Sequence, residues 1–175
     1  MNRTVDLHPF SVPRYPTGQP AQRAAVHVLV TQDDGQQAVT QWRAANREAR
    51  LHHLALPHYP CEAELLQALV ELLGEARVGV HLQLQGDEAF IWTLNPVARD
   101  AGLEAEEIDL QCSNANRRLL FCVHCATRQA TSTADLHTCA QCGVRLEIRR
   151  HFSERLGAYI GVCADADQPY AQARP

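Results

Sequence analysis

The chain has 175 residues, of which 46% are hydrophobic and 21% charged, and its formal net charge is −4. This composition is typical of a globular protein, and the length allows one ordinary domain or a medium domain with a small one. No apolar run approaches the roughly 20 residues that span a bilayer, and the N-terminus lacks the apolar stretch of a signal peptide. We therefore expect a cytoplasmic protein. Because thiols stay reduced there, seven cysteines favour metal or redox chemistry over a disulfide framework.

The charged residues are unevenly distributed along the chain. Residues 1–111 hold 8 arginines against 15 acidic residues, whereas residues 112–155 hold 7 arginines against 3 acidic residues. The chain thus reads as an acidic piece followed by a basic one. Residues 1–23 are rich in proline and polar residues, and we expect an extended arm there.

Residues 24–112 alternate between strand and helix patterns. Apolar residues at every second position indicate strands, and wide apolar stripes indicate helices. The predicted strands are 26–31, 52–56, 77–85 and 107–112, and the predicted helices are 36–50, 62–76 and 88–101, the last interrupted near Pro96. Gly35 ends the turn after the first strand, where a positive φ is expected. The order βαβαβαβ predicts an α/β domain: a parallel, Rossmann-like sheet with flanking helices.

This α/β piece resembles the nucleotide-binding half of ferredoxin reductase-type flavoenzymes. The resemblance rests on Gly86-Asp-Glu-Ala-Phe90, the helix that follows, and a closing strand at Ile108-Asp-Leu110. Dinucleotide sites need glycines after the first strand, but this chain has Thr31-Gln-Asp-Asp-Gly35, and its two carboxylates would repel a pyrophosphate. We expect a degenerate scaffold without a nucleotide, and NAD(P) binding is the alternative.

Four cysteines near the C-terminus have the spacing of a metal site. They form two turns, Cys122-Val-His-Cys125 and Cys139-Ala-Gln-Cys142, and each turn can direct two sulfurs at one centre. The residues between them, 126–138, are small, polar and β-branched, as in a β-hairpin. A tetrahedral four-sulfur site suits zinc or a single iron, and zinc is favoured because the aromatic packing of rubredoxins is sparse here. A closed site of this kind stabilises a fold rather than catalysing a reaction.

The other potential ligands lack a partner at ligand spacing. His124 and His137 lie beside the quartet, and we expect them to be exposed or hydrogen-bonded because four thiolates already fill a zinc shell. Cys61, Cys112 and Cys163 stand outside the pattern, and Cys112 is expected in the core. No combination of nucleophile, base and orienting group points to independent catalysis.

The segment that follows the quartet is unusual for a zinc ribbon. Leu146 and Ile148 fit a last ribbon strand. The residues that follow, up to Asp167, include several side chains with a polar end group and a run of small residues. We expect this part to lie on a surface rather than in a core. Residues 113–175 are thus predicted to form a zinc-ribbon-like or rubredoxin-like β module with a C-terminal interaction tail.

The quartet, together with Arg149-Arg-His-Phe-Ser-Glu-Arg-Leu-Gly-Ala-Tyr-Ile-Gly-Val162 and Ala164-Asp-Ala-Asp167, resembles the small subunit of bacterial dimethylamine monooxygenase, the haem-dependent oxidative N-demethylase complex. The match covers about residues 115–169. It implies a non-catalytic or electron-path-aligning subunit of an NADPH-dependent hetero-oligomer that converts dimethylamine to methylamine and formaldehyde. The haem would belong to an oxygenase subunit, and the FMN and iron–sulfur groups to a reductase subunit. The candidate partner-binding residues are Arg149, Arg150, His151, Arg155 and Tyr159.

Three other functions remain open at this point. The arginines of the C-terminal piece could make a zinc ribbon that binds nucleic acid, although aromatic residues for base stacking are sparse. The quartet could make a rubredoxin-like electron carrier if it holds iron. A free-standing NADPH enzyme is the third possibility.

Overall fold

The computed structural model describes the chain except for residues 1–10, 14, 16–23, 46–49, 76–78 and 167–175. It divides into two compact units, one formed by Tyr15–Arg117 and the other by residues 118–166 with the described N-terminal residues 11–13. The arm predicted at residues 1–23 lies outside the described residues except for 11–13 and 15. None of the described helices has the length and hydropathy that a bilayer crossing requires.

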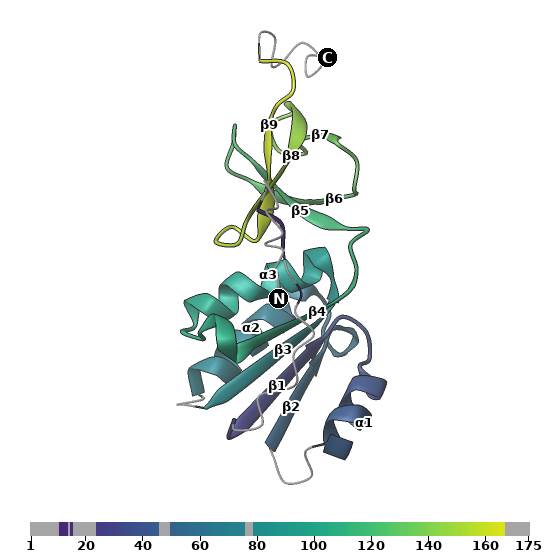
Figure 1. Cartoon of the computed structure of the whole chain (residues 1–175), viewed down its shortest axis with the longest axis vertical. Helices are drawn as coiled ribbons and strands as arrows, with labels where there is room; N and C mark the ends of the chain where they lie inside the picture. The colour runs from purple at the N-terminus through teal and green to yellow at the C-terminus, as the bar shows by residue number, and fades with distance from the viewer. Residues whose placement is uncertain (1–10, 14, 16–23, 46–49, 76–78, 167–175) are drawn as a thin grey trace, which may run out of the picture. The chain divides into compact units, whose positions relative to one another are not determined.

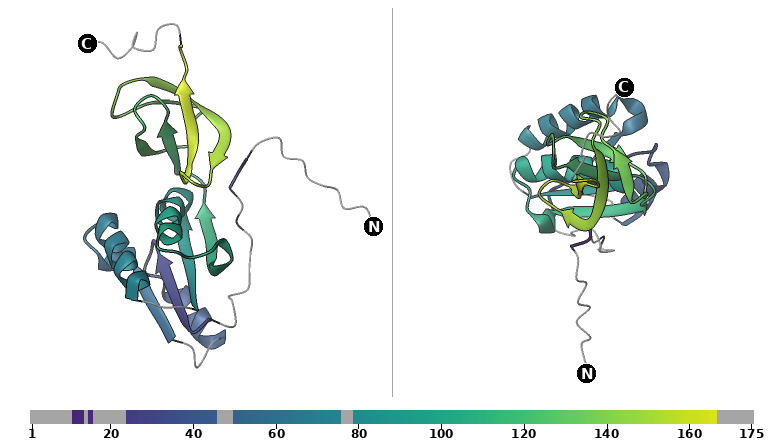
Figure 2. Two further views of the ribbon diagram at one scale, coloured as in Figure 1. Left: turned by 90° about the vertical axis from the view of Figure 1, so that its left-hand side faces the viewer. Right: turned by 90° about the horizontal axis from the view of Figure 1, so that it is seen from above.

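The first unit is built on a four-stranded, fully parallel sheet (Figure 1). Its strands are β1 (Val26–Thr31), β2 (Arg50–Ala55), β3 (Val80–Asp87) and β4 (Ile108–Asn114), in the spatial order β2-β1-β3-β4. The helices are α1 (Gln36–Ala45), α2 (Glu62–Glu75) and α3 (Glu88–Asp100), with short 3-10 turns η1 (Leu56–His58) and η2 (Ala105–Glu107). Helices α2 and α3 pack together on one face of the sheet and α1 covers the other (Figure 2). The predicted parallel sheet with flanking helices is confirmed.

The two faces of this sheet differ in polarity. Val28 and Val30 of β1 and Leu82 and Leu84 of β3 are fully buried on the face that α2 and α3 cover. On the α1 face, the buried His27 lies against the ring of Trp42, with ring centroids 4.9 Å apart. Arg50 belongs to β2, where it pairs with Val26, so the prediction that the first helix includes Arg50 is wrong. Gly35 has a φ of 62°, as the turn after β1 requires.

The second unit is a curled five-stranded sheet. Its strands are β5 (Arg118–Cys122), β6 (Arg128–Thr131), β7 (Leu136–Thr138), β8 (Arg145–Ser153) and β9 (Ala158–Cys163), in the order β6-β5-β9-β8-β7. Only β5 and β9 are parallel neighbours. The hairpin predicted within residues 126–138 is wrong, because β6 and β7 occupy opposite edges of the sheet. Each instead pairs across a cysteine turn, β6 with β5 and β7 with β8.

The segment after Ile148 is part of the core of this unit, and the expectation that it would lie apart from a core is wrong. Phe152 and Ala158 are buried, and β9 lies inside the sheet between β5 and β8. The register between β8 and β9 shifts between Ile148, which pairs with Gly161, and Phe152, which pairs with Tyr159. This β-bulge accommodates two extra residues on β8 and leaves the polar residues 149–151 exposed while the apolar residues on either side stay buried.

Candidate metal centre

The two cysteine turns share one backbone conformation. In the first turn the amide of Ala126 donates to the carbonyl of Cys122 at 2.9 Å, and in the second the amide of Gly143 donates to the carbonyl of Cys139 at 2.9 Å. The fifth residue of each turn has a left-handed backbone, with φ of 58° at Ala126 and 71° at Gly143. Because each turn joins the two strands of a hairpin, β5–β6 or β7–β8, the sheet brings the two turns together.

The four sulfurs form one compact group. All lie within 4.8 Å of one another, and they are the one set of three or more potential metal ligands of this kind among the residues that the structure describes. The Cys122 and Cys142 sulfurs are 3.8 Å apart, and those of Cys125 and Cys139 are 3.6 Å apart. A zinc–sulfur bond of about 2.3 Å gives a tetrahedron with edges of about 3.8 Å. The donors and their spacing therefore fit one tetrahedral metal ion.

The environment of the sulfurs is mostly apolar. Cys122 and Cys139 are buried, whereas Cys125 and Cys142 are half-buried. They pack with a cluster of buried side chains from β5, β8 and the second turn, namely Leu120, Val144, Leu146 and Ile148. This shell covers one side of the site, and four sulfur ligands leave no coordination position free for a substrate.

The four thiols do not ionise equally. Burial opposes ionisation of Cys139, but donation from the amides of Cys142 and Gln141 and from the Gln129 side chain lowers its pKa to about 6. Burial raises the pKa of Cys142 to about 12 and also raises the pKa of Cys122. The Thr127 hydroxyl lowers the pKa of Cys125. Four thiolates this close repel one another, so full ionisation requires a cation among them.

Strand β6 carries polar groups toward the site that sequence reasoning missed. Gln129 and Thr131 on β6 are less exposed than Arg128 and Ala130, and the half-buried Thr127 directly precedes the strand with the same alternation. The Cys125 thiol contacts the Thr127 hydroxyl at 3.4 Å, and the Gln129 side-chain carbonyl accepts a hydrogen bond from the Ala140 amide at 2.9 Å. The period-two alternation of Thr, Gln and Thr was the signal that could have indicated a strand with a polar inner face.

The two histidines near the quartet have different environments. His137 on β7 hydrogen-bonds with the Thr131 hydroxyl at 3.0 Å through Nδ1 and lies 3.3 Å from the Gln129 carbonyl oxygen through Nε2. The expected hydrogen-bonding role of His137 is thus confirmed. His124, in the first turn, is exposed.

The remaining cysteines lie outside the site. Cys61 is exposed before α2, and Cys112 on β4 is half-buried rather than fully in the core. Cys163 on β9 packs against the apolar cluster and donates to the Asp165 carbonyl at 3.1 Å.

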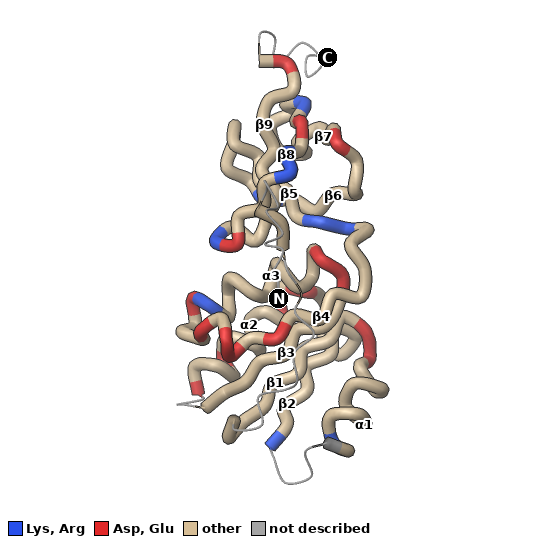
Figure 3. The backbone as a smooth tube through the Cα atoms, in the orientation of Figure 1, with Lys and Arg blue, Asp and Glu red and all other residues tan. Residues whose placement is uncertain are grey.

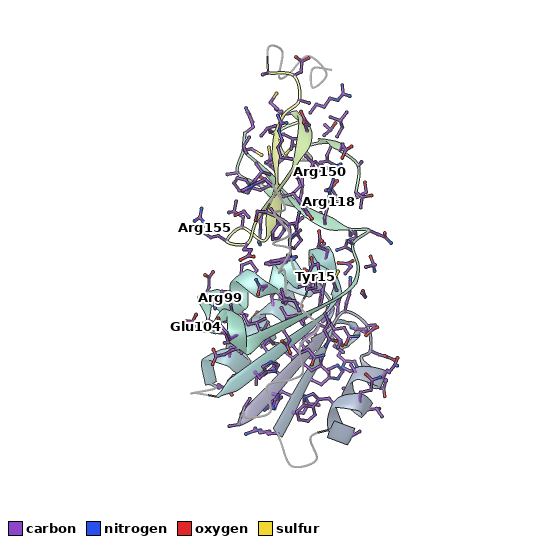
Figure 4. The ribbon with its side chains drawn as sticks, in the orientation of Figure 1. Tyr15, Arg99, Glu104, Arg118, Arg150 and Arg155 are labelled. Carbon is purple, nitrogen blue, oxygen red and sulfur yellow. The ribbon has the colours of Figure 1, made fainter. Side chains whose placement is uncertain are left out.

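The predicted partner-binding residues all come from the β8–β9 hairpin. Arg149, Arg150 and His151 occupy the bulge of β8 and are exposed, and Arg155 is exposed in the turn between the strands (Figure 4). A cavity of about 320 Å³ lies beside the bulge, lined by Asp135, Glu147, Ile148, Arg149 and Arg150. Tyr159 is half-buried, with its ring 5.1 Å from that of Phe152. The structure brings the first three residues together on one bulge and places Arg155 and Tyr159 elsewhere on the hairpin.

The arginines of the second unit are distributed along its backbone (Figure 3), and several of them make internal contacts. Arg118 lies over the Tyr159 ring, 5.0 Å from its centroid, and donates to two carbonyls of the 132–134 loop. Arg128 donates to the Leu156 carbonyl, and Arg149 pairs with Glu147 at 2.8 Å. These internal contacts engage Arg118, Arg128 and Arg149, which makes those three side chains less available to nucleic acid phosphates.

In the first unit, the carboxyl ends of β1 and β3 flank the position where a doubly wound sheet binds a phosphate group. Here the Gln32 side chain closes that position: it donates to the Asp87 carboxylate at 3.0 Å and accepts from the Asp87 amide at 2.6 Å. Asp87 also caps α3 by accepting from the Phe90 amide at 2.8 Å. The Gln32 side chain and the Asp87 carboxylate thus bond to each other and to the backbone amides of Asp87 and Phe90.

Comparisons with known proteins find relatives described as subunits of oxidative N-demethylase and of dimethylamine monooxygenase. The family model described as dimethylamine monooxygenase subunit DmmA-like, C-terminal domain, matches residues 110–162. The chain is also 54% identical over 175 residues, 100% of both chains, to the "Heme-dependent oxidative N-demethylase delta subunit" of Ectopseudomonas mendocina (strain ymp). No solved structure is significantly similar to the chain.

Proposed function

The chain belongs to the family of delta subunits of heme-dependent oxidative N-demethylase, and on that premise we propose that it is an assembly subunit of such a complex. The full-length relationship to a delta subunit is the observation that carries this proposal. The closed four-sulfur site supports it, because a site without an open position holds a fold together and does not bind substrate.

The proposed reaction of the complex is the NADPH-dependent oxidative N-demethylation of dimethylamine to methylamine and formaldehyde. The description of the matching family, a dimethylamine monooxygenase subunit, supports this substrate. In this scheme a haem-containing subunit performs the oxygenation, and a reductase subunit with FMN and an iron–sulfur cluster supplies electrons. In this scheme the chain holds the partner subunits in position relative to one another and does not itself carry a reacting group.

The proposed metal is zinc, held by Cys122, Cys125, Cys139 and Cys142. Bound there, zinc supplies no chemistry beyond cross-linking the two turns, because four thiolates fill its shell. A single iron, which would make the chain a rubredoxin-like electron carrier, fits the same sulfur spacing. Metal analysis of the purified chain distinguishes the two: iron gives a coloured oxidised protein, whereas zinc leaves it colourless.

The proposed contact surface is the β8 bulge with its neighbouring turn, formed by Arg149, Arg150, His151 and Arg155. The exposure of all four and the adjacent cavity support this choice. Tyr159, the fifth candidate, packs inward with Phe152, and we propose that it supports the hairpin beneath that surface.

Charge reversal tests the proposed contact surface. We expect Arg150→Glu to weaken co-purification of the haem and reductase subunits with the tagged chain at least tenfold, measured by the haem absorbance that elutes with it. Arg145→Glu is the matched control, because Arg145 is also an exposed arginine on β8 but lies outside the bulge. Equal recovery of haem with both variants would refute this surface. Absence of haem with the wild-type chain would refute the assembly role itself.

The α/β unit is proposed to be a degenerate Rossmann-like scaffold that binds no nucleotide. The strand order β2-β1-β3-β4, with its reversal between β1 and β3, supports a doubly wound ancestry. The Gln32 side chain and the Asp87 carboxylate at that reversal support the loss of the nucleotide.

A further inference from the structure

The two hairpins that carry the cysteine turns are joined differently on their two sides. On one side, β9 lies between β5 and β8 and pairs with both of them through its backbone. Gly161 of β9 is buried there, and a Cβ atom added to it would lie 2.7 Å from Cδ1 of Leu120 and 3.1 Å from Cδ1 of Leu146. Backbone hydrogen bonds and close packing therefore hold the hairpins together on this side.

The other side of the hairpins, where β6 and β7 meet, is joined by side chains. These two strands are the edges of the sheet and are not backbone partners. The Thr131 hydroxyl on β6 bonds with Nδ1 of His137 on β7 at 3.0 Å, and Nε2 of the same ring lies 3.3 Å from the side-chain oxygen of Gln129. That oxygen also accepts the backbone amide of Ala140 in the second cysteine turn at 2.9 Å. These contacts of Thr131, His137, Gln129 and Ala140 form a seam between the two edges.

The directions of the hydrogen bonds in the seam follow from the groups that make them. The Ala140 amide can only donate, so the Gln129 oxygen faces it. This oxygen can only accept, so the His137 ring carries its proton on Nε2, and Nδ1 of the neutral ring accepts from the Thr131 hydroxyl. Loss of that hydroxyl, which is buried, therefore leaves Nδ1 without its donor and weakens the seam.

Each hairpin supplies two of the four sulfurs, so release of a metal ion held by all four requires the two turns to separate. Local opening is easiest where few backbone hydrogen bonds must break. We propose that the seam is the gate of the metal centre: β6 and β7 separate there while β9 keeps the hairpins joined on the other side. Thr131 and His137 are its positioning residues, and its opening sets the rate of metal exchange. This inference rests on the proposed metal centre.

The experiment uses the full chain loaded with zinc, and in parallel with cobalt. Thr131→Val replaces the hydroxyl with a methyl group of similar size and removes the hydrogen bond to His137. Thr138→Val is the matched control, because it makes the same change at an exposed threonine of β7. His137→Phe breaks the same bond from the other strand and serves as the second seam variant.

Three quantities are measured on each chain. The first is the rate of zinc transfer to a coloured chelator over a range of chelator concentrations. The second is the energy of the sulfur-to-cobalt charge-transfer band. The third is the hydrogen exchange of the Ala140 amide, which belongs to the seam, and of the amides of β9, which do not.

We expect the zinc release rate of the wild-type chain to reach a plateau at high chelator concentration, because opening of the seam then limits it. Thr131→Val should raise this plateau and the exchange rate of the Ala140 amide about tenfold, the effect of one lost hydrogen bond in a buried site. His137→Phe should raise both at least as much. The cobalt band and the exchange of β9 should keep their wild-type values, because the ligands and the β9 side are unchanged. Thr138→Val should match the wild-type chain throughout.

Equal zinc release from the Thr131→Val and Thr138→Val chains would overturn the proposal. A release rate that rises linearly with chelator concentration would also overturn it, because the chelator would then attack the half-buried Cys125 and Cys142 directly. Faster exchange throughout β9 in both seam variants would make the seam a general structural support and not a gate. A wild-type chain that retains no metal would refute the metal centre itself, which separates the two hypotheses.

Discussion

Ala126 adopts the left-handed backbone that Gly143 adopts at the same position of the other cysteine turn, with φ of 58° and 71°. A side chain in this conformation costs roughly 1 kcal/mol relative to glycine. We expect Ala126→Gly to raise the free energy of unfolding of the metal-loaded chain by about 1 kcal/mol, and Gly143→Ala to lower it by at least that much. Chemical denaturation of both variants measures this. Changes of the same sign would contradict the assignment of strain to Ala126.

Removal of the metal should unfold one unit and spare the other. The second unit has a small apolar core, so we expect metal binding to supply much of its folding free energy. On chelation we expect hydrogen-exchange protection to be lost in β5 and β9 and retained in β1 and β3. Cys139→Ser should reproduce the loss, whereas Cys163→Ser, outside the quartet, should not. Protection of β9 in the chelated chain would argue against a structural metal.

Gly86 at the end of β3 has no room for a side chain. A Cβ atom there would lie 2.5 Å from Cδ1 of Phe90 and 2.9 Å from Cβ of Gln32. We expect Gly86→Ala to lower the free energy of unfolding by about 1–3 kcal/mol, because both neighbours must shift. Gly74→Ala is the control: nothing lies within 4 Å of its added Cβ on helix α2, and the change should stabilise by about 0.5–1 kcal/mol. Thermal unfolding compares the two.

The α/β unit should lose stability on mild acidification. His27 and His81 are buried with ring centroids 5.5 Å apart, and burial lowers the pKa of both below the ordinary value of 6.5. Asp109, 3.4 Å from the His81 ring, and Glu107 oppose the shift of His81 only in part. The unfolded chain therefore binds more protons, and the stability present above pH 6.5 falls as the pH drops toward the lowered folded-state values.

Denaturation between pH 7 and 5 measures this dependence, a range in which ordinary carboxylates, with pKa values of about 4, change little. His27→Gln should flatten the curve because one buried histidine no longer titrates. His151→Gln removes an exposed histidine and should leave the wild-type slope. Identical slopes in the two variants would exclude His27 as a source of the pH dependence.

NADPH should not stabilise the chain. The Gln32 side chain and the Asp87 carboxylate occupy the position where a doubly wound sheet would receive phosphate. At about 1 mM NADPH we expect no change in the unfolding temperature, since a ligand stabilises only the state that binds it. A rise of several degrees would overturn the proposal that the scaffold has lost its nucleotide.

The sequence by itself determined the local elements and the ligand set. Alternating valines and leucines predicted β1 and β3, and the order of strands and helices predicted a parallel sheet, because these patterns depend on residues only two to four positions apart. The cysteine spacing likewise predicted two turns facing one centre. The full-length relationship then confirmed the oxygenase family that the segment after Cys142 had suggested.

Only the tertiary structure showed which strands of the second unit pair with one another. The pairing of β5 with β9, the separation of β6 from β7 and the bulge at Arg149–His151 depend on contacts between distant segments that no local periodicity encodes. For the same reason the sequence predicts Gln129 within a hairpin of residues 126–138, whereas in the structure its side-chain carbonyl accepts a hydrogen bond from Ala140 in the second cysteine turn. The spacing of the cysteines in the sequence predicts the four candidate ligands. The side chains around them could be identified only from the folded sheet, because strand pairing depends on packing between distant segments.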